Sequence, residues 1–381
     1  MNYRTRIIEL DGLRGLACLS VMFAHYFGEV QHGSRFLALG WAGVDVFFVL
    51  SGFLIGGILL DNRDSDTYFS TFYIRRGFRI FPIYYVTISI VLLLLPTTSG
   101  QVWPKTDMPT LPYFVYLQNT VMTFLATEGY YWLFPTWTLC VEEQFYLILP
   151  LIVYLTPSPY MRSVAIGFIL SAAILRFIFT MTVSNHLSLM LAEHVLLVSR
   201  WDLLFFGVLA ADVFRSREIW KKLIDRDFRV LKAIVLSSTA IFPVLVMVDK
   251  FTGLPAFDLL GCSAIGATFM GLILLIAGGA HEAGRFRSKT LRFFGQISYC
   301  LYLVHQPIAG IMHGLILGGY PDIGNLAEFA VTIAAVAVSV GIAYMSWVYF
   351  EQPLIRIGHR WNYGSHSSPP LDDGSRGWAK P

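Results

Sequence analysis

The sequence carries little charge for its length. Of its 381 residues only 14% are Asp, Glu, Lys or Arg, whereas 55% are hydrophobic and the mean hydropathy is +0.60. Soluble domains contain about 25% charged residues, because their surfaces face water. A chain with so few charges and so many apolar residues is excluded from that class, and its composition indicates an integral membrane protein.

Two further shortages exclude other classes of protein. Basic residues barely outnumber acidic ones, 28 against 25, and the formal net charge of +3 argues against a nucleic acid as partner. There are only four cysteines, and each lies inside an apolar run, which excludes a disulfide framework and a zinc site. These cysteines are Cys18, Cys140, Cys262 and Cys300. No metal-binding set is predicted.

Long apolar windows are what the sequence does contain. A helix needs about 20 mostly apolar residues to cross the hydrocarbon core. Ten windows fit: 9–28, 41–60, 80–96, 135–155, 163–183, 197–214, 232–249, 257–277, 296–316 and 326–350. Two shorter apolar pieces, near 112–126 and 185–198, are expected to be re-entrant or interfacial. No small-residue cleavage site follows the first window, so we expect a retained span and not a signal peptide.

The distribution of basic residues predicts the orientation, because Lys and Arg are retained on the cytoplasmic side. With the N-terminus inside, 22 of the 28 lie in inner segments, and only Arg35, Lys105, Arg200 and Lys250 lie in outer ones. We therefore expect an all-α, polytopic membrane bundle of about ten transmembrane helices with both termini cytoplasmic. Residues 1–360 are predicted to form one membrane domain and 361–381 a disordered cytoplasmic tail.

Ionisable residues inside the windows are candidates for function, because each costs at least about 2.5–3.5 kcal/mol on insertion. Arg14 and His25 are eleven residues apart, close to three helical turns, so they are expected to face the same way. Asp45 shares a helical face with Gly52 and Gly56, and small residues mark a face packed against other helices. Asp45 is therefore predicted to point into the bundle.

The fourth window adds two adjacent carboxylates, Glu142 and Glu143. By depth, this pair, His25 and Asp45 all fall in the outer half of the membrane and are predicted to form one polar site. We interpret His25 as a general base that Asp45 or Glu142 orients. The alternative is that His25 is a hydrogen-bonded packing residue and that Arg14 only reaches to the inner surface.

Other polar residues of the windows are less informative. His305, near mid-membrane and flanked by two tyrosines, suits a functional role and a packing role equally well. Arg176 is expected to make a structural ion pair or to reach the membrane surface. His313 and Asp258 receive no assignment.

Three arginines lie in the predicted loop between the second and third windows. Arg75, Arg76 and Arg79 occur in YIRRGFRIFP, where their spacing gathers them on one side of a helical turn. The plain interpretation is a topological signal on the inner side. Arginine, unlike lysine, also binds phosphate through two parallel hydrogen bonds, so the cluster predicts a phosphorylated cytoplasmic ligand.

These motifs together resemble the acyltransferase-3 family of membrane acyltransferases over almost the whole chain. They are LDGLRGLACLSVMFAH, with the Arg-x10-His spacing of Arg14 and His25; GVDVFFVLSGFLIG from Gly43; RRGFRIFPIYY, with Arg76 and Arg79 as Arg-x-x-Arg; WTLCVEEQFYLILP from Trp137; ISYCLYLVHQPI around His305; and YFEQP with Glu351. Each motif alone is weak, but six in this order are specific.

The resemblance implies transfer of an acyl group, usually acetyl, from cytoplasmic acyl-CoA to a hydroxyl that often lies on the outer side. It implies a bacterial inner-membrane protein whose acceptor is a glycan or lipid-linked saccharide, with no permanently bound cofactor. It implies His25 as the essential histidine, Arg14 as its partner, and Arg76 with Arg79 as the donor-side pair. Arg75 and His305 join them as candidate donor-binding residues. Whether transfer is direct or passes through an acyl-histidine stays open.

Two departures and two alternatives accompany this expectation. Cys140 stands where the family commonly has Ser or Ala, and the hydrolase-like outer domain of some members is absent, which suggests the stand-alone branch. Some relatives act on small molecules such as macrolides, which is one alternative. A proton-coupled transporter is the other, since such carriers also line their interior with charges, but no paired interrupted helices support it.

Overall fold

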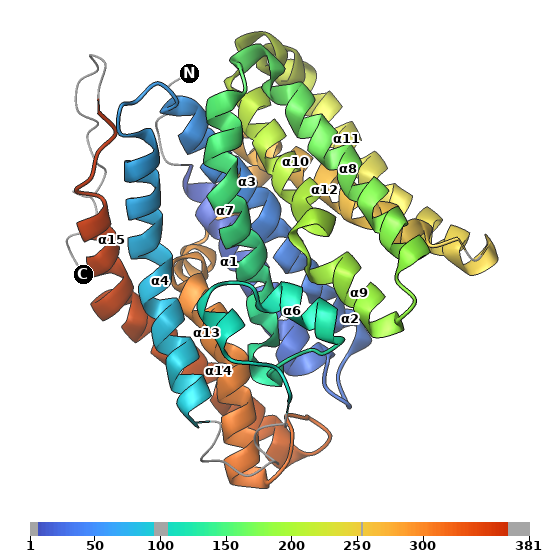
Figure 1. Cartoon of the computed structure of the whole chain (residues 1–381), viewed down its shortest axis with the longest axis vertical. Coiled ribbons are helices and arrows are strands. Elements are labelled where there is room, and N and C mark those ends of the chain that lie inside the picture. Colours follow the sequence, from blue (N-terminus) through green and yellow to red (C-terminus); the bar gives the residue numbers. More distant parts are fainter. Residues whose placement is uncertain (1–6, 95–105, 253, 365–381) are drawn as a thin grey trace.

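The computed structural model describes residues 7–94, 106–252 and 254–364, and every regular element in these ranges is a helix (Figure 1). Nine of the described helical segments are long and apolar enough to cross a membrane. Nine predicted windows fall on these segments, and the tenth, 9–28, falls on the first helix and the π-helical turn that follows it. The predicted all-α, polytopic membrane fold is confirmed.

The elements run in the following order: α1 (Ile8–Phe23), η1 (Ala24–Gly28), α2 (Arg35–Ala38), η2 (Leu39–Ala42), α3 (Gly43–Asp61), α4 (Tyr68–Leu94), α5 (Leu111–Phe114), α6 (Gln118–Leu125), η4 (Tyr131–Thr136), α7 (Trp137–Leu155), η5 (Ser158–Tyr160), α8 (Met161–Thr182), α9 (His186–Val195), α10 (Leu197–Arg215), α11 (Arg217–Thr252), α12 (Ala256–Ala277), η6 (His281–Arg287), α13 (Lys289–Leu317), α14 (Leu326–Ser346), η7 (Trp347–Glu351) and α15 (Gln352–Gly358). The short apolar pieces near 112–126 and 185–198 form α5, α6 and α9, as separate short helices.

Helix α4 corrects the predicted boundary of the third window. It begins at Tyr68, well before residue 80, so the three arginines lie within a helix and not in a loop. The physical reason is that Tyr68 and Phe72, one turn apart, are both buried in the bundle core and keep this polar stretch helical. Residues 95 and 96, the end of the predicted window, lie outside the described residues.

Helix α1 lies inside the bundle, in contact with α13 on one side and with α3 on another (Figure 1). Glycine makes this approach possible. A Cβ on Gly15 would lie 1.8 Å from the carbonyl oxygen of Leu291, and one on Gly295 would lie 2.0 Å from that of Asp11. Since neither position has room for a side chain, α1 and α13 pack backbone against backbone.

The α3 and α10 helices pack in the same way, and this confirms the predicted buried face of the second window. A Cβ on Gly52 would lie 1.9 Å from the carbonyl oxygen of Leu204, and one on Gly207 would lie 2.1 Å from that of Val49. Asp45, on this face, is fully buried.

The short helices α2, α6 and α9 lie in the lower half of Figure 1, above the lower ends of α13 and α14. They belong to segments that the distribution of Lys and Arg places outside the cell. The backbone N–H and the Nδ1 of His32 lie 3.0 and 2.6 Å from the carboxylate of Asp322, which precedes α14. The orientation itself stays a prediction.

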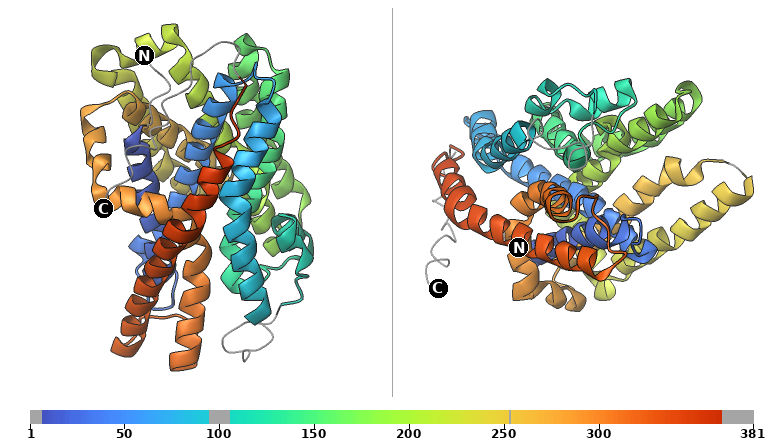
Figure 2. Two further views of the ribbon diagram at one scale, coloured as in Figure 1. Left: turned by 90° about the vertical axis from the view of Figure 1, so that its left-hand side faces the viewer. Right: turned by 90° about the horizontal axis from the view of Figure 1, so that it is seen from below.

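The beginning of the predicted disordered tail is ordered against α4 (Figure 2). We call residues 361–364 the strap. The Arg75 Nε donates to the carbonyl oxygen of Trp361 at 2.7 Å, and its Nη2 donates to Asn362 at 2.9 Å. Thr67 and Thr71 both donate to the carbonyl oxygen of Asn362. These polar partners lie on α4, far away in sequence, and the predicted division at residue 360 stays a prediction. Residues 365–381 lie outside the described residues.

Candidate active site

His25 lies in the π-helical turn η1, which interrupts the end of α1. Such turns are rare and occur often at functional sites, because they turn one side chain out of the α-helical register. The His25 ring stacks on the ring of His305 from α13, with centroids 5.0 Å apart and planes 11° apart. Their nitrogens, Nδ1 of His25 and Nε2 of His305, are 2.7 Å apart. We call these two residues the histidine pair.

The hydrogen bonds of the histidine pair indicate where its protons lie. The Nδ1 of His305 lies 2.7 Å from the carbonyl oxygen of Tyr302. A carbonyl oxygen only accepts, so we infer that this Nδ1 carries the proton of neutral His305. Its Nε2 then accepts from the Nδ1–H of His25, which leaves the Nε2 of His25 unprotonated. The pair therefore presents one basic nitrogen, that of His25.

Glu29 is the carboxylate beside that nitrogen, and the sequence analysis did not identify it. Its Oε2 lies 3.6 Å from the Nε2 of His25, one turn further along. Burial raises the pKa of Glu29, which follows the last residue of η1. Its spacing of four residues from His25 is the sequence signal that points to it.

The structure corrects the prediction that Asp45 or Glu142 orients His25. The Nδ1 of His25 is held by His305, and among the described residues neither carboxylate makes a contact with the imidazole. Asp45 accepts from the Arg200 Nη1 at 3.3 Å. Glu142 accepts from the Ser51 hydroxyl at 2.8 Å. The error is physical, because residues at one depth on different helices need not face one another.

Glu142 belongs instead to a second polar group, which we call the arginine cluster: Arg14, Arg76, Arg79, Glu142 and Tyr146. Arg76 lies over the ring of Tyr146, 4.6 Å from its centroid. Arg14 interacts electrostatically with Arg76 and Glu142, and Arg79 interacts with Arg14 and Arg76. The predicted common face of Arg14 and His25 thus supports two separate groups along the same helix.

Arg75 is separated from the other two predicted donor-binding arginines. Its guanidinium holds the strap through Trp361 and Asn362, and it also lies over the ring of Tyr363 at 5.3 Å. The helical spacing grouped all three residues, but Arg75 points about 100° away from Arg76, and its bonds to the strap hold its guanidinium away from Arg79, one turn further along. Arg76 and Arg79 lie in the arginine cluster with Arg14, whereas Arg75 makes its contacts at the surface of α4.

Glu351 lies beside the arginine cluster and belongs to a second π-helical turn, η7. Its carboxylate is buried, accepts from the Ser346 hydroxyl at 3.0 Å, and interacts electrostatically with Arg79. Both π-helical turns of the described chain therefore carry a residue of the matched motifs, His25 in one and Glu351 in the other.

One further buried cation is structural. Arg176 donates to Asp202 at 2.9 Å, to the carbonyl oxygen of Leu259 at 2.9 Å and to that of Ser199. Both charged side chains are buried, so Arg176 makes an ion pair and does not reach the membrane surface. The sequence analysis missed Asp202, whose place in an apolar window was the available signal.

The described residues contain no group of three or more His, Cys, Asp or Glu arranged to hold a metal ion. What they do contain is a base with a defined free nitrogen and, along the same helix, a cluster of three guanidiniums. A base suits proton transfer from a hydroxyl or water. Guanidiniums suit an anionic group, above all a phosphate.

Comparison with known proteins identifies the family of this chain. A family model described as an acyltransferase domain matches residues 7–348. The peptidoglycan O-acetyltransferase OatA of Listeria monocytogenes is 27% identical over 373 residues, which cover 93% of this chain and 57% of the relative. The acyltransferase MdmB of Streptomyces mycarofaciens is 27% identical over 400 residues, which cover 97% of each chain. No solved structure matches. The chain belongs to the acyltransferase-3 family.

Proposed function

We propose that this protein is a membrane O-acyltransferase. It moves an acetyl or other short acyl group from cytoplasmic acyl-CoA to a hydroxyl of a glycan or lipid-linked saccharide on the extracytoplasmic side. The observation that carries the proposal is the histidine pair, in which hydrogen bonds leave a single unprotonated nitrogen on His25. Family membership and the O-acetyltransferase name of the Listeria relative support it.

The arginine cluster is proposed to bind the phosphates of acyl-CoA. Asp11, Glu142, Glu143 and Glu351 are the carboxylates within electrostatic range of the arginine cluster, whose three guanidiniums still repel one another. An anion placed among them relieves the repulsion. Arg14 lies about 16 Å from His25 along the axis at 1.5 Å per residue, a span that the extended pantetheine arm of acyl-CoA is proposed to bridge.

The chemical step then follows from the proton positions. The acceptor hydroxyl oxygen attacks the thioester carbonyl carbon, and its proton passes to the Nε2 of His25. The tetrahedral intermediate collapses as the C–S bond breaks, and the imidazolium returns the proton to the thiolate, which leaves as the free thiol of CoA. Glu29, 3.6 Å from Nε2, stabilises the imidazolium while it exists. A covalent acyl-His25 intermediate is the other route.

His305 has a positioning role in this proposal and does not bind the donor. Its Nδ1–H is engaged by Tyr302, and its Nε2 accepts from His25, so neither nitrogen has a proton to offer an oxyanion. A tyrosine hydroxyl is the remaining candidate for that role, because Arg14 lies about 16 Å from His25 along the helix axis.

The proposal is tested with the full chain in sealed vesicles that contain a peptidoglycan-derived oligosaccharide, with acetyl-CoA added outside. The expected result is release of the free thiol of CoA that depends on the enclosed oligosaccharide and yields its O-acetyl ester. If thiol release is absent both with this acceptor and with water alone, the chain does not use acetyl-CoA and the proposal fails.

Arg76→Ala and Arg79→Ala are each expected to raise the KM for acyl-CoA about 10- to 100-fold, because a charge-assisted hydrogen bond contributes about 1.5–3 kcal/mol. The KM for the acceptor should change little. Lysine at either position should restore donor binding only in part, since it cannot form the two parallel bonds. The matched control is Lys221→Ala, an exposed cation of α11. Full restoration by lysine at both positions favours a purely topological role.

A further inference from the structure

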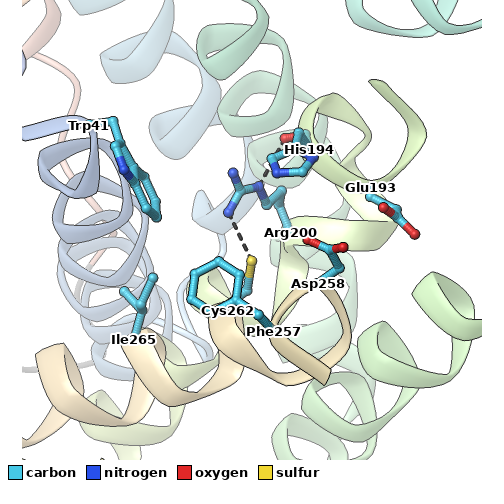
Figure 3. A pocket seen from close by; sticks show the side chains of 8 residues that line it. All are labelled: Trp41, Glu193, His194, Arg200, Phe257, Asp258, Cys262 and Ile265. Carbon is cyan, nitrogen blue, oxygen red and sulfur yellow. Dashed lines mark hydrogen bonds between the residues drawn. The ribbon is translucent and has the colours of Figure 1, made fainter. Parts of the chain in front are cut away.

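A cavity of about 280 Å³ lies where η2 and the start of α3 meet α9, α10 and α12 (Figure 3). Trp41 and Phe257 form aromatic walls, and Arg200 lies between Trp41 on one side and Glu193 and Asp258 on the other. Neither the proposed chemistry nor the donor phosphates use this cavity. Its volume is at the small end of ligand sites, which measure about 300–1,000 Å³, so it suits one ring-sized unit.

Arg200, the cation of the cavity, is already paired with a carboxylate of the protein. Arg200 donates to Asp45 at 3.3 Å, to the carbonyl oxygen of His194 at 2.9 Å and to the Cys262 sulfur at 3.0 Å. Its guanidinium also lies 5.6 Å from the centre of the Trp137 ring. Arg200 is therefore committed to the protein, and a phosphate or another anion finds no free cation here.

Hydrogen-bond acceptors, in contrast, remain available in the cavity. The Asp258 carboxylate is exposed and makes no hydrogen bond or ion pair within the described ranges. The Nδ1 of His194 donates to the carbonyl oxygen of Met190, so in the neutral ring its Nε2 is an acceptor. One oxygen of Glu193 accepts from Thr180, and the other is left for a ligand. A matching ligand presents several donors and apolar faces.

We propose that this cavity binds one saccharide unit of a glycan acceptor, apart from the unit that is acylated. A sugar ring offers hydroxyl donors to the acceptors of Glu193, His194 and Asp258, and its C–H faces pack on the aromatic walls. The proposal rests on the proposed function and deepens it, since it assigns the acceptor a second contact.

The position of the cavity relative to the histidine pair supports an extended acceptor. Trp41 belongs to η2, which contacts η1, the turn that carries His25. The residue before it, Gly40, packs so closely on α1 that a Cβ there would lie 3.3 Å from that of Ala24, the neighbour of His25. His305 lies across α1 on α13, so cavity and histidine pair flank the same helix end. One glycan chain passing over this end contacts both.

The test measures binding to the purified full chain by titration calorimetry, without acyl-CoA, using chitotetraose, maltotetraose and isomaltotetraose. At least one is expected to bind saturably. Asp258→Asn should weaken that binding about fivefold and Trp41→Leu about tenfold, because each removes a contact with the ring. The matched controls are Asp107→Asn, an exposed carboxylate, and Phe36→Leu, an exposed aromatic, both outside the cavity. Both should bind as the unmodified chain does.

Other outcomes overturn the inference. If no oligosaccharide binds, or if binding is the same in Asp258→Asn and Trp41→Leu as in the controls, the cavity is not a saccharide site. Binding of tetraethylammonium in place of any oligosaccharide would assign the cavity to a cation. Failure of the proposed function is recognised separately, by the absence of thiol release from acetyl-CoA in the vesicle assay.

Discussion

Replacing His25 with alanine is expected to abolish acyl transfer, lowering turnover by about 10²–10⁴-fold, the contribution of a positioned base. The reason is that the histidine pair presents its only unprotonated nitrogen on this residue. The KM for acyl-CoA should be nearly unchanged, because the arginine cluster is intact. Thiol release and the yield of folded protein are measured together. Turnover above a tenth of that of the unmodified chain removes His25 from the catalytic role.

The hydrogen bond from His25 to His305 predicts the effect of replacing His305. His305→Leu should lower turnover about 10- to 100-fold, as loss of an orienting partner does, with the donor KM unchanged. His305→Gln should recover part of it, since an amide oxygen can accept from the Nδ1–H of His25. Because the two residues act as a unit, the double variant with His25→Ala should be no slower than His25→Ala alone. Additive losses would show that they act independently.

His313 offers a matched control for these variants. It lies on α13 like His305, is buried, and its Nε2 is 2.9 Å from the Thr332 hydroxyl. His313→Gln is expected to reduce stability at most and to leave the proton chemistry intact. A loss of turnover equal to that of His305→Leu would mean that any disturbed histidine of α13 impairs the enzyme.

Asp202→Ala is expected to prevent normal folding. It removes the only carboxylate within hydrogen-bond distance of the buried Arg176 in the described chain. Leaving one partner of a buried ion pair uncompensated costs about 3–5 kcal/mol, a large part of the total stability of most proteins. The yield of monodisperse protein in detergent and the midpoint of thermal unfolding measure the effect.

The loss of stability in Asp202→Ala should come from the uncompensated charge of Arg176, and not from the space that the shorter side chain leaves. Arg176→Met combined with Asp202→Leu removes both charges and is expected to be more stable than Asp202→Ala. Glu218→Gln, which breaks the exposed pair with Lys222 on α11, should leave the midpoint unchanged. If the double variant is less stable than the single one, the hydrogen bonds from Arg176 to main-chain carbonyls matter more than its charge.

The spans were predictable because hydrophobicity is a local property of the sequence, and each predicted window falls on a helix. The start of α4 was not predictable, because its first turns are polar. Tyr68 and Phe72 hold these turns in place through contacts with residues elsewhere in the chain. The same limit applies to Arg75. Helical spacing places it near Arg76, but only the distant strap decides where it makes its contacts.

The candidate site shows the limit more clearly. The motifs pointed to His25 and His305 separately, but nothing local joins residues that are 280 positions apart. The sequence predicts how far along its helix a residue lies, but not which neighbouring helix its side chain faces. Asp45 and Glu142 therefore were placed at a plausible level beside the wrong neighbours. The π-helical turn at His25 adds to this, since the arithmetic of 100° per residue does not apply within it.

The hydrogen-bond donors that hold the strap bind mainly to its main-chain carbonyl oxygens. Arg75, Thr67 and Thr71 all donate to main-chain carbonyl oxygens, those of Trp361 and Asn362. A carbonyl oxygen is present whatever the side chain. The number of residues between α15 and Asn362 therefore matters for the strap in addition to the Trp361 side chain, whose ring stacks on that of Phe78 with centroids 5.8 Å apart. A one-residue insertion there would shift both carbonyls away from their donors, whereas a substitution would leave them in place.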